Sequence, residues 1–195
     1  MRFHGYPVPP ERWLELALWR EATTVFMLSG HGGCSAHGLA VAALRRGFQA
    51  VVVTSQAGVP FEDNVRGEKK EVVRIAHTTF ERELRALGGK VELRDFGHQD
   101  VADALARGAV PLVLLSGYRL YDERVPHWVA VTGFDDDHLY LHDPLVPDGT
   151  SRADAVHLPI KRHFFDKVSR WGRARHRAMV VLERWGKLRH HQPGS

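Results

Sequence analysis

The chain has 195 residues, of which 44% are apolar and 26% charged, as is ordinary for one globular domain. This composition excludes a largely disordered, collagen-like or coiled-coil protein. No apolar run approaches the roughly 18 residues of a membrane span, and residues 1–10 lack the apolar centre of a signal peptide. We therefore expect one soluble, cytoplasmic domain over residues 1–195 that makes no contact with a membrane.

The net charge of +4 is concentrated at the C-terminal end. Residues 161–195 contain 10 basic and 2 acidic residues, which gives this segment +8 and leaves −4 for the rest. Such a segment can bind nucleic acid or an acidic partner, but it is more often a solvated terminal element. We expect the second role, so nucleic acid is not predicted as a partner.

Periodicity and glycine stops predict the following elements in chain order. The first half contains a helix at 11–21, a glycine-rich turn at 29–33, a helix at 35–46, a strand at 49–55 and a long helix at 68–87. The second half contains a strand at 90–93, a helix at 100–107, the central strands 110–116, 126–133 and 138–142, a helix at 164–171 and a last strand at 178–182. Because helices come first and strands later, we expect the α+β class, with an antiparallel sheet packed against helices.

A β-hairpin is predicted where the strands 126–133 and 138–142 flank a connection rich in glycine and aspartate. With the turn centred on Asp135, His127 faces Asp143. Both then lie on the face that carries Val129 and Leu141, which the apolar residues direct to the core. An even shift in register keeps the two residues on one face, whereas an odd shift separates them.

The predicted pair of His127 and Asp143 suits a general base, because a carboxylate fixes the tautomer and orientation of an imidazole. The alternative is a structural role, in which a partly buried histidine is satisfied by a nearby carboxylate. In that case Pro144 simply ends the strand, since proline cannot continue the ladder of hydrogen bonds.

The only cysteine, Cys34, follows two glycines and precedes a predicted helix. A thiol at a helix N-terminus ionises more easily, and the free N–H groups there can hold an oxyanion. With His127 and Asp143, Cys34 would complete a Cys–His–Asp triad. The alternative is a small buried residue at a tight contact between helix and loop.

A zinc site is a further alternative, because His31, Cys34 and His37 follow one another at steps of three and could leave a fourth position to water. Glycines at positions 30, 32, 33 and 38 argue against a regular helix through all three. We therefore predict no metal site.

Seven segments resemble one known family in the order in which that family has them. They are Leu18–Thr24, Ser29–Cys34, Gly38–Ala43, Arg45–Phe48, Pro111–Ser116, Pro126–Val129 and His142–Pro144. The chain resembles, from about Glu15 to Val181, a bacterial branch of the papain-like cysteine peptidases. This branch is related to the bacteriocin-processing (double-glycine leader) peptidases, and some of its members are associated with a GNAT-type acetyltransferase.

The resemblance implies a papain-like fold and a Cys–His–Asp triad, with His127 as the catalytic histidine and Asp143 as the residue that orients it. The chain departs from the family at the nucleophile. In such families the cysteine lies in a Cys-Gly-Pro-like motif at the start of an earlier helix, a few residues after a glutamine. The block around Cys34 instead resembles a second block downstream, and Gln49 follows Cys34. We therefore expect the chain to lack the N-terminal nucleophile helix.

Three explanations of this departure remain open: a missing N-terminal segment, a non-catalytic relative that binds peptide, and Cys34 as a replacement nucleophile. The function expected from the resemblance is a cysteine-peptidase-like hydrolase of peptide or amide bonds, with Cys34, His127 and Asp143 as candidate catalytic residues. The alternative is an inactive peptidase-like domain that binds a peptide or a partner protein. A peptide or protein substrate and an acetyltransferase-type partner domain are implied. No cofactor is expected, because a thiol supplies its own nucleophile.

Overall fold

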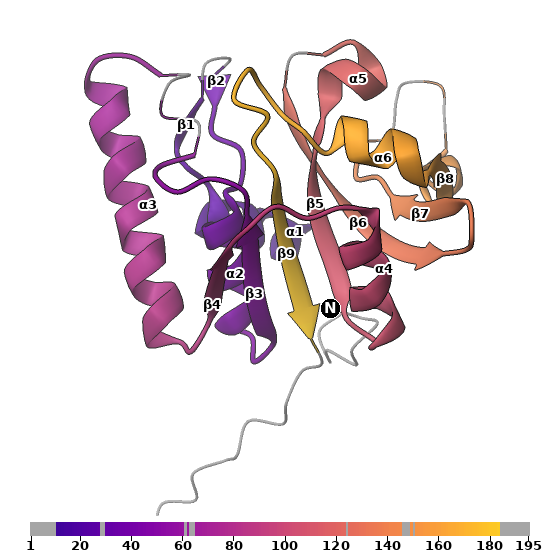
Figure 1. Ribbon diagram of the computed structural model, residues 1–195. Helices are drawn as coiled ribbons and strands as arrows, with labels where there is room; N and C mark the ends of the chain where they lie inside the picture. The colour runs from indigo at the N-terminus through magenta and orange to yellow at the C-terminus, as the bar shows by residue number, and fades with distance from the viewer. Residues whose placement is uncertain are drawn as a thin grey trace, which may run out of the picture.

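The computed structural model (Figure 1) describes residues 11–27, 30–60, 62, 65–123, 125–145, 149 and 151–183. Its main sheet has seven strands in the order β4-β3-β9-β5-β6-β7-β8. Their bounds are β3 Gln49–Thr54, β4 Lys90–Leu93, β5 Val110–Ser116, β6 Pro126–Phe134, β7 His138–His142, β8 Leu158–Lys161 and β9 Ala178–Glu183. Every neighbouring pair in this sheet is antiparallel except β3 and β4. The predicted α+β class with a mostly antiparallel sheet is therefore confirmed, in agreement with a papain-like fold.

Helices cover both faces of this sheet. Figure 1 shows α4 (His98–Ala106) and α6 (Arg162–Val168) on the near side, with α1 (Arg12–Ala22) and α2 (Ala36–Leu44) on the far side. The other described elements are the helices α3 (Glu68–Ala86), α5 (Gly117–Tyr121) and the 3-10 helix η3 (Arg152–Ala155), and the two-stranded sheet of β1 (Phe26–Met27) and β2 (Gly30–His31). No helix of the described residues is long and apolar enough to cross a membrane.

The sheet separates two apolar cores, and β5 contributes side chains to both. Leu115 packs with β6 and β7 residues and with Phe165 of α6, whereas the adjacent Leu114 packs with α2 and with Leu84 of α3. Successive side chains of a strand point to opposite faces, so a strand covered on both sides is a continuous apolar run. This explains why 110–116 could be recognised as a strand without an alternating pattern.

Local chemistry explains α2, the helix that follows Cys34. Ser35 caps it, because the Ser35 hydroxyl accepts a hydrogen bond from the Gly38 amide at 2.9 Å. A Cβ atom on Gly38 would lie 2.4 Å from the carbonyl oxygen of Ala22, so only glycine allows α1 and α2 to approach this closely. Gly47, with φ of +81°, follows the helix in the left-handed region that glycine favours.

Two expectations about the layout are wrong, and β8, α5, η3 and the β1–β2 sheet are elements that the sequence did not predict. The strands 110–116 and 126–133 are central as predicted, but the third central strand is β9 and not 138–142, because the last strand inserts between β3 and β5. Residues 162–168 and 178–183 form α6 and the buried strand β9, so this half of the basic segment belongs to the fold and is not a solvated terminal element. Residues 184–195 lie outside the described residues, as does Ser29 of the predicted glycine-rich turn.

Candidate functional site

The β6–β7 hairpin brings His127 and Asp143 to the same face of the sheet. Val131 pairs with Leu141, where the sequence predicted Leu139, and a β-bulge follows between Val131 and Gly133. The predicted register is therefore wrong by two residues at this end of the hairpin. Because this shift is even, the face is unchanged, and His127 reaches Asp143 diagonally across the strands.

His127 and Asp143 form a short hydrogen bond, with 2.6 Å between His127 Nε2 and Asp143 Oδ1. The side chain of Asp143 is 2% exposed and that of His127 is 15% exposed. Asp143 Oδ1 also accepts a hydrogen bond from the Leu145 amide at 2.8 Å, and Oδ2 accepts one from the Tyr121 hydroxyl. The Asp143 amide donates to the carbonyl of Ala155 at 2.9 Å. The backbone and both carboxylate oxygens of Asp143 are thus held in place.

The electrostatics of this group keep Asp143 ionised. Burial by itself raises the pKa of Asp143, but hydrogen bonds from His127, Tyr121 and the Leu145 amide outweigh it and hold the pKa below its ordinary value. Burial and the contact with the Asp143 carboxylate raise the pKa of Tyr121. Tyr121 therefore stays a protonated donor at neutral pH, and the carboxylate carries the charge.

The hydrogen bond with Asp143 decides which nitrogen of His127 is available for chemistry. When Nε2 donates its proton to the carboxylate, Nδ1 carries the lone pair and can accept a proton. Within the described part of the chain, Nδ1 makes no hydrogen bond. The ring of Tyr121 lies edge-on to the imidazole, with 5.8 Å between the centroids. A reacting group must therefore approach His127 at Nδ1.

The structure does not bring Cys34 to this pair. Cys34 lies directly before Ser35, the cap of α2, and its carbonyl accepts a hydrogen bond from Trp128 Nε1 at 2.9 Å. Trp128 packs into the core on the α2 side, whereas His127 shares the opposite face with Val129. The described residues contain no hydrogen bond between Cys34 Sγ and His127.

The environment of Cys34 also differs from the expected activation by a helix N-terminus. Burial raises the pKa of the Cys34 thiol to about 11. Cys34 precedes Ser35, the cap of the helix, and the Gly38 amide already donates its hydrogen bond to the Ser35 hydroxyl. Desolvation of the thiolate therefore dominates the pKa.

We expect Cys34 to react slowly with iodoacetamide. At pH 8 a thiol of pKa about 11 is almost wholly protonated, so alkylation should be roughly 100-fold slower than for an unperturbed cysteine. Mass spectrometry across a pH series measures the rate, and the same chain unfolded in urea is the control. A rate in the folded chain that levels off near pH 8.5 would contradict the pKa assignment.

The zinc site considered for His31, Cys34 and His37 receives no support from the described side chains. His31 belongs to β2, and its side chain lies outside the described part. His37 is buried in the first turn of α2 and belongs to a group of candidate metal ligands on α2 and α3 that does not include Cys34.

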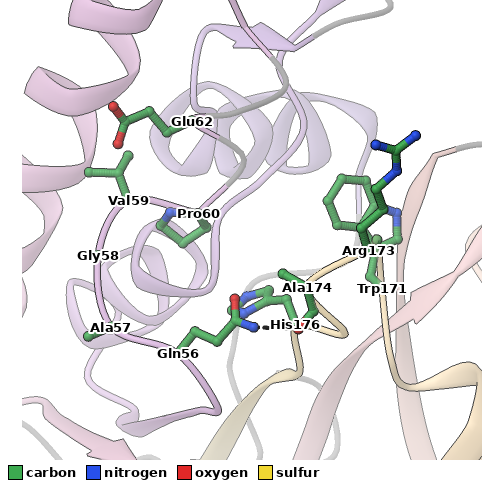
Figure 2. A pocket seen from close by; sticks show the side chains of 11 residues that line it. Gln56, Ala57, Gly58, Val59, Pro60, Glu62, Trp171, Arg173, Ala174 and His176 are labelled. Carbon is green, nitrogen blue, oxygen red and sulfur yellow. Dashed lines mark hydrogen bonds between the residues drawn. The ribbon is translucent and has the colours of Figure 1, made fainter.

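Two cavities border Asp143. The larger, of about 520 Å³, lies on the His127 side and is lined by Leu120, Tyr121, Leu141, Asp143, Leu158, Pro159, Ile160, Lys161, His163 and Phe164. The smaller, of about 350 Å³, is bordered by Trp128 and His142. A third cavity of about 600 Å³ lies between the loops that carry Gln56–Pro60 and Trp171–His176, and neither His127 nor Asp143 lines it (Figure 2).

Tyr121 is the site residue that sequence reasoning missed. It lies on α5, a short helix that the sequence did not predict, directly after β5. Since β5 pairs with β6 and Leu115 opposes His127, the residues that follow β5 lie near the start of β6. A prediction that these two strands pair in antiparallel fashion would have placed Tyr121 near the start of β6, where His127 lies.

Comparison with known proteins agrees with the resemblance in the sequence. No curated protein and no solved structure matches the chain at a significant level. A family model described as "Peptidase_C39 like family" matches residues 1–183. The model covers both His127 and Asp143, the residues that the fold brings into contact. The chain therefore belongs to the Peptidase_C39 like family.

Proposed function

We propose that the chain is a cysteine-peptidase-like hydrolase of peptide or amide bonds that uses a Cys–His–Asp arrangement. The observation that carries this proposal is the hydrogen bond of 2.6 Å between His127 and the buried carboxylate of Asp143. Membership of a peptidase-like family supports it. A histidine with a purely structural role could form the same hydrogen bond with a carboxylate. A general base also requires a second nitrogen that is open to a reacting group, and Nδ1 of His127 makes no hydrogen bond among the described residues.

The proposed reaction assigns a role to each group. His127 Nδ1 takes the proton of a thiol, and the thiolate attacks the substrate carbonyl. Asp143 stabilises the imidazolium that forms, and His127 then protonates the leaving amine. Water attacks the thioester, again with His127 as the base, and releases the acid and the free thiol.

Cys34 is the only thiol of the sequence and so the candidate nucleophile within it. Reaction through Cys34 requires the segment before α2 to move, because its carbonyl is held by Trp128 and its side chain makes no hydrogen bond with His127. We therefore expect the Cys34→Ala variant to lose the hydrolytic activity of the unchanged chain.

The larger cavity beside Asp143 suits a peptide or protein substrate. Its wall is mainly apolar, with Leu120 and Phe164 among its residues, and Lys161 and His163 also line it. Such a lining can accept an apolar side chain of a substrate, although His127 itself does not line this cavity. The relation to the bacteriocin-processing peptidases, an acetyltransferase-type partner domain, a single domain over residues 1–195 and a cytoplasmic location stay proposals from the sequence.

The test is hydrolysis of a quenched fluorescent peptide library by the purified chain. We expect His127→Ala to lower kcat by about 10²–10⁴-fold, as removal of a general base does. His138→Ala, on β7 of the same hairpin, is the matched control and should retain activity. Equal activity of the His127→Ala variant and the unchanged chain would overturn the proposal, as would no hydrolysis by the unchanged chain.

A further inference from the structure

A second group of polar side chains lies between α2 and α3. His37 comes from the first turn of α2, and His77 and Glu81 are one turn apart on α3. Residues four apart on a helix share a face, so α3 presents His77 and Glu81 together to α2. The group lies on the α2 side of the sheet, opposite the face that carries His127. It therefore does not depend on the proposed hydrolysis.

The geometry of this group is compact. One ligand atom from each residue lies within 4.8 Å of the other two. The rings of His37 and His77 meet edge to face, with 4.6 Å between the centroids. His77 Nε2 and Glu81 Oε1 are 3.6 Å apart, which is too long for a hydrogen bond. The three potential metal ligands thus lie close together but form no hydrogen bonds with one another.

Burial makes this arrangement unusual. His37 is 5% exposed and His77 is 7% exposed, and Nδ1 of each ring is buried and makes no hydrogen bond among the described residues. A histidine that serves only for packing is expected to pair both polar atoms with a carbonyl, a carboxylate or water. Two neighbouring rings that both fail to do so point to a ligand.

We propose that His37, His77 and Glu81 bind one divalent transition-metal ion of the zinc type, which ties α2 to α3. Two imidazoles and one carboxylate are a known ligand set for Zn²⁺ and leave a fourth position open to water. Mg²⁺ and Ca²⁺ prefer oxygen ligands throughout, so they fit this set poorly. Ligand atoms on a shared tetrahedral zinc ion lie about 3.4 Å apart. Side-chain rotations that move each ligand atom by about 1 Å therefore close the site.

Solvent can reach the site through Glu81. Its side chain is 37% exposed, whereas both histidines are buried. The ion can thus enter without opening the core. Glu81 is also the residue that can be replaced with least effect on packing.

The test is zinc binding by the full chain without a purification tag. After equilibrium dialysis against Zn²⁺, we expect about one zinc per chain by elemental analysis. Glu81→Gln and His77→Ala should each weaken the affinity at least about 10-fold. Glu71→Gln is the matched control, because Glu71 is an exposed residue of the same helix. A variant with His190→Ala and His191→Ala excludes the adjacent histidines near the C-terminus as the ligands.

A second measurement guards against loss of fold. Zinc should raise the Tm of the unchanged chain, because an ion that binds only the folded state stabilises it, and EDTA should reverse the shift. The shift should be smaller in Glu81→Gln at the same zinc concentration, and the circular dichroism of this variant should match that of the unchanged chain. The proposal is wrong if the unchanged chain binds no zinc, if folded Glu81→Gln binds zinc as the unchanged chain does, or if only the variant at positions 190 and 191 loses it.

Discussion

Asp143→Ala is expected to lower the free energy of unfolding by about 3 kcal/mol. The substitution leaves His127, the Tyr121 hydroxyl and the Leu145 amide without their common acceptor. The carboxylate is 2% exposed, so water replaces it poorly. Urea unfolding followed by circular dichroism measures the change as a lower midpoint with an unchanged slope.

The pH dependence of stability provides a separate test of Asp143. Its pKa in the folded chain lies below the ordinary value of about 3.9 that it takes when unfolded. Its ionised form therefore stabilises the fold above the unfolded pKa, and this contribution is lost as the pH falls below about 4 through the folded pKa. Asp143→Asn should lose less stability than the unchanged chain over this acidic range.

Asp136→Ala is the matched control for Asp143, because Asp136 is an exposed aspartate in the turn of the same hairpin. Exposed substitutions of this kind usually change stability by less than about 0.5 kcal/mol. Equal unfolding midpoints for the Asp136 and Asp143 variants would show that the contacts of Asp143 do not stabilise the fold.

Phe165→Ala is expected to destabilise the chain by about 3–5 kcal/mol, which is typical of a large buried aromatic residue cut to alanine. Phe165 is 0% exposed and packs α6 against the core that also contains Val131 and Leu139. Its removal takes apolar area from the core and leaves a cavity that the surrounding sheet cannot fill. Thermal and urea unfolding both measure this loss.

The neighbouring residue supplies a matched control. Phe164 lies on the same helix and is 39% exposed, so Phe164→Ala removes the same atoms from a partly solvated position. We expect the Phe164 variant to lose less than half of what the Phe165 variant loses. If both variants unfolded at the same urea concentration, the assignment of the buried face of α6 would be wrong.

Much of the fold could be predicted because its signals are local. Gln49–Thr54 contains a run of β-branched residues. Ser35 precedes α2 and Gly47 follows it, and Gly88 follows α3 with φ of +78°. The hairpin could be placed from its Gly/Asp-rich turn, and strand alternation then put His127 and Asp143 on one face. The exact register failed because the turn lies further along the chain than Asp135, with Phe134 paired to Leu139. The β-bulge then changes the register by one residue, so that the total shift is even.

Other parts of the site had no local signal. Tyr121 meets Asp143 only because β5 pairs with β6, and the Asp143 amide is held by the carbonyl of Ala155, twelve positions further along the chain. His37 stands 40 positions before His77, and no spacing rule relates them. The sequence instead associated His37 with Cys34, its neighbour along the chain.

The sequence by itself determined the types of the longer elements, the α+β class, the family and the shared face of His127 and Asp143. These follow from the periodicity of side chains and from turn residues, which act over a few positions. Only the tertiary structure decided that β9 lies at the centre of the sheet, that the Cys34 carbonyl binds Trp128 while its thiol makes no hydrogen bond with His127, and that His37 meets His77 and Glu81. The physical reason is that these contacts join distant segments, whose pairing depends on how all the apolar surfaces are buried together and not on any single stretch of chain.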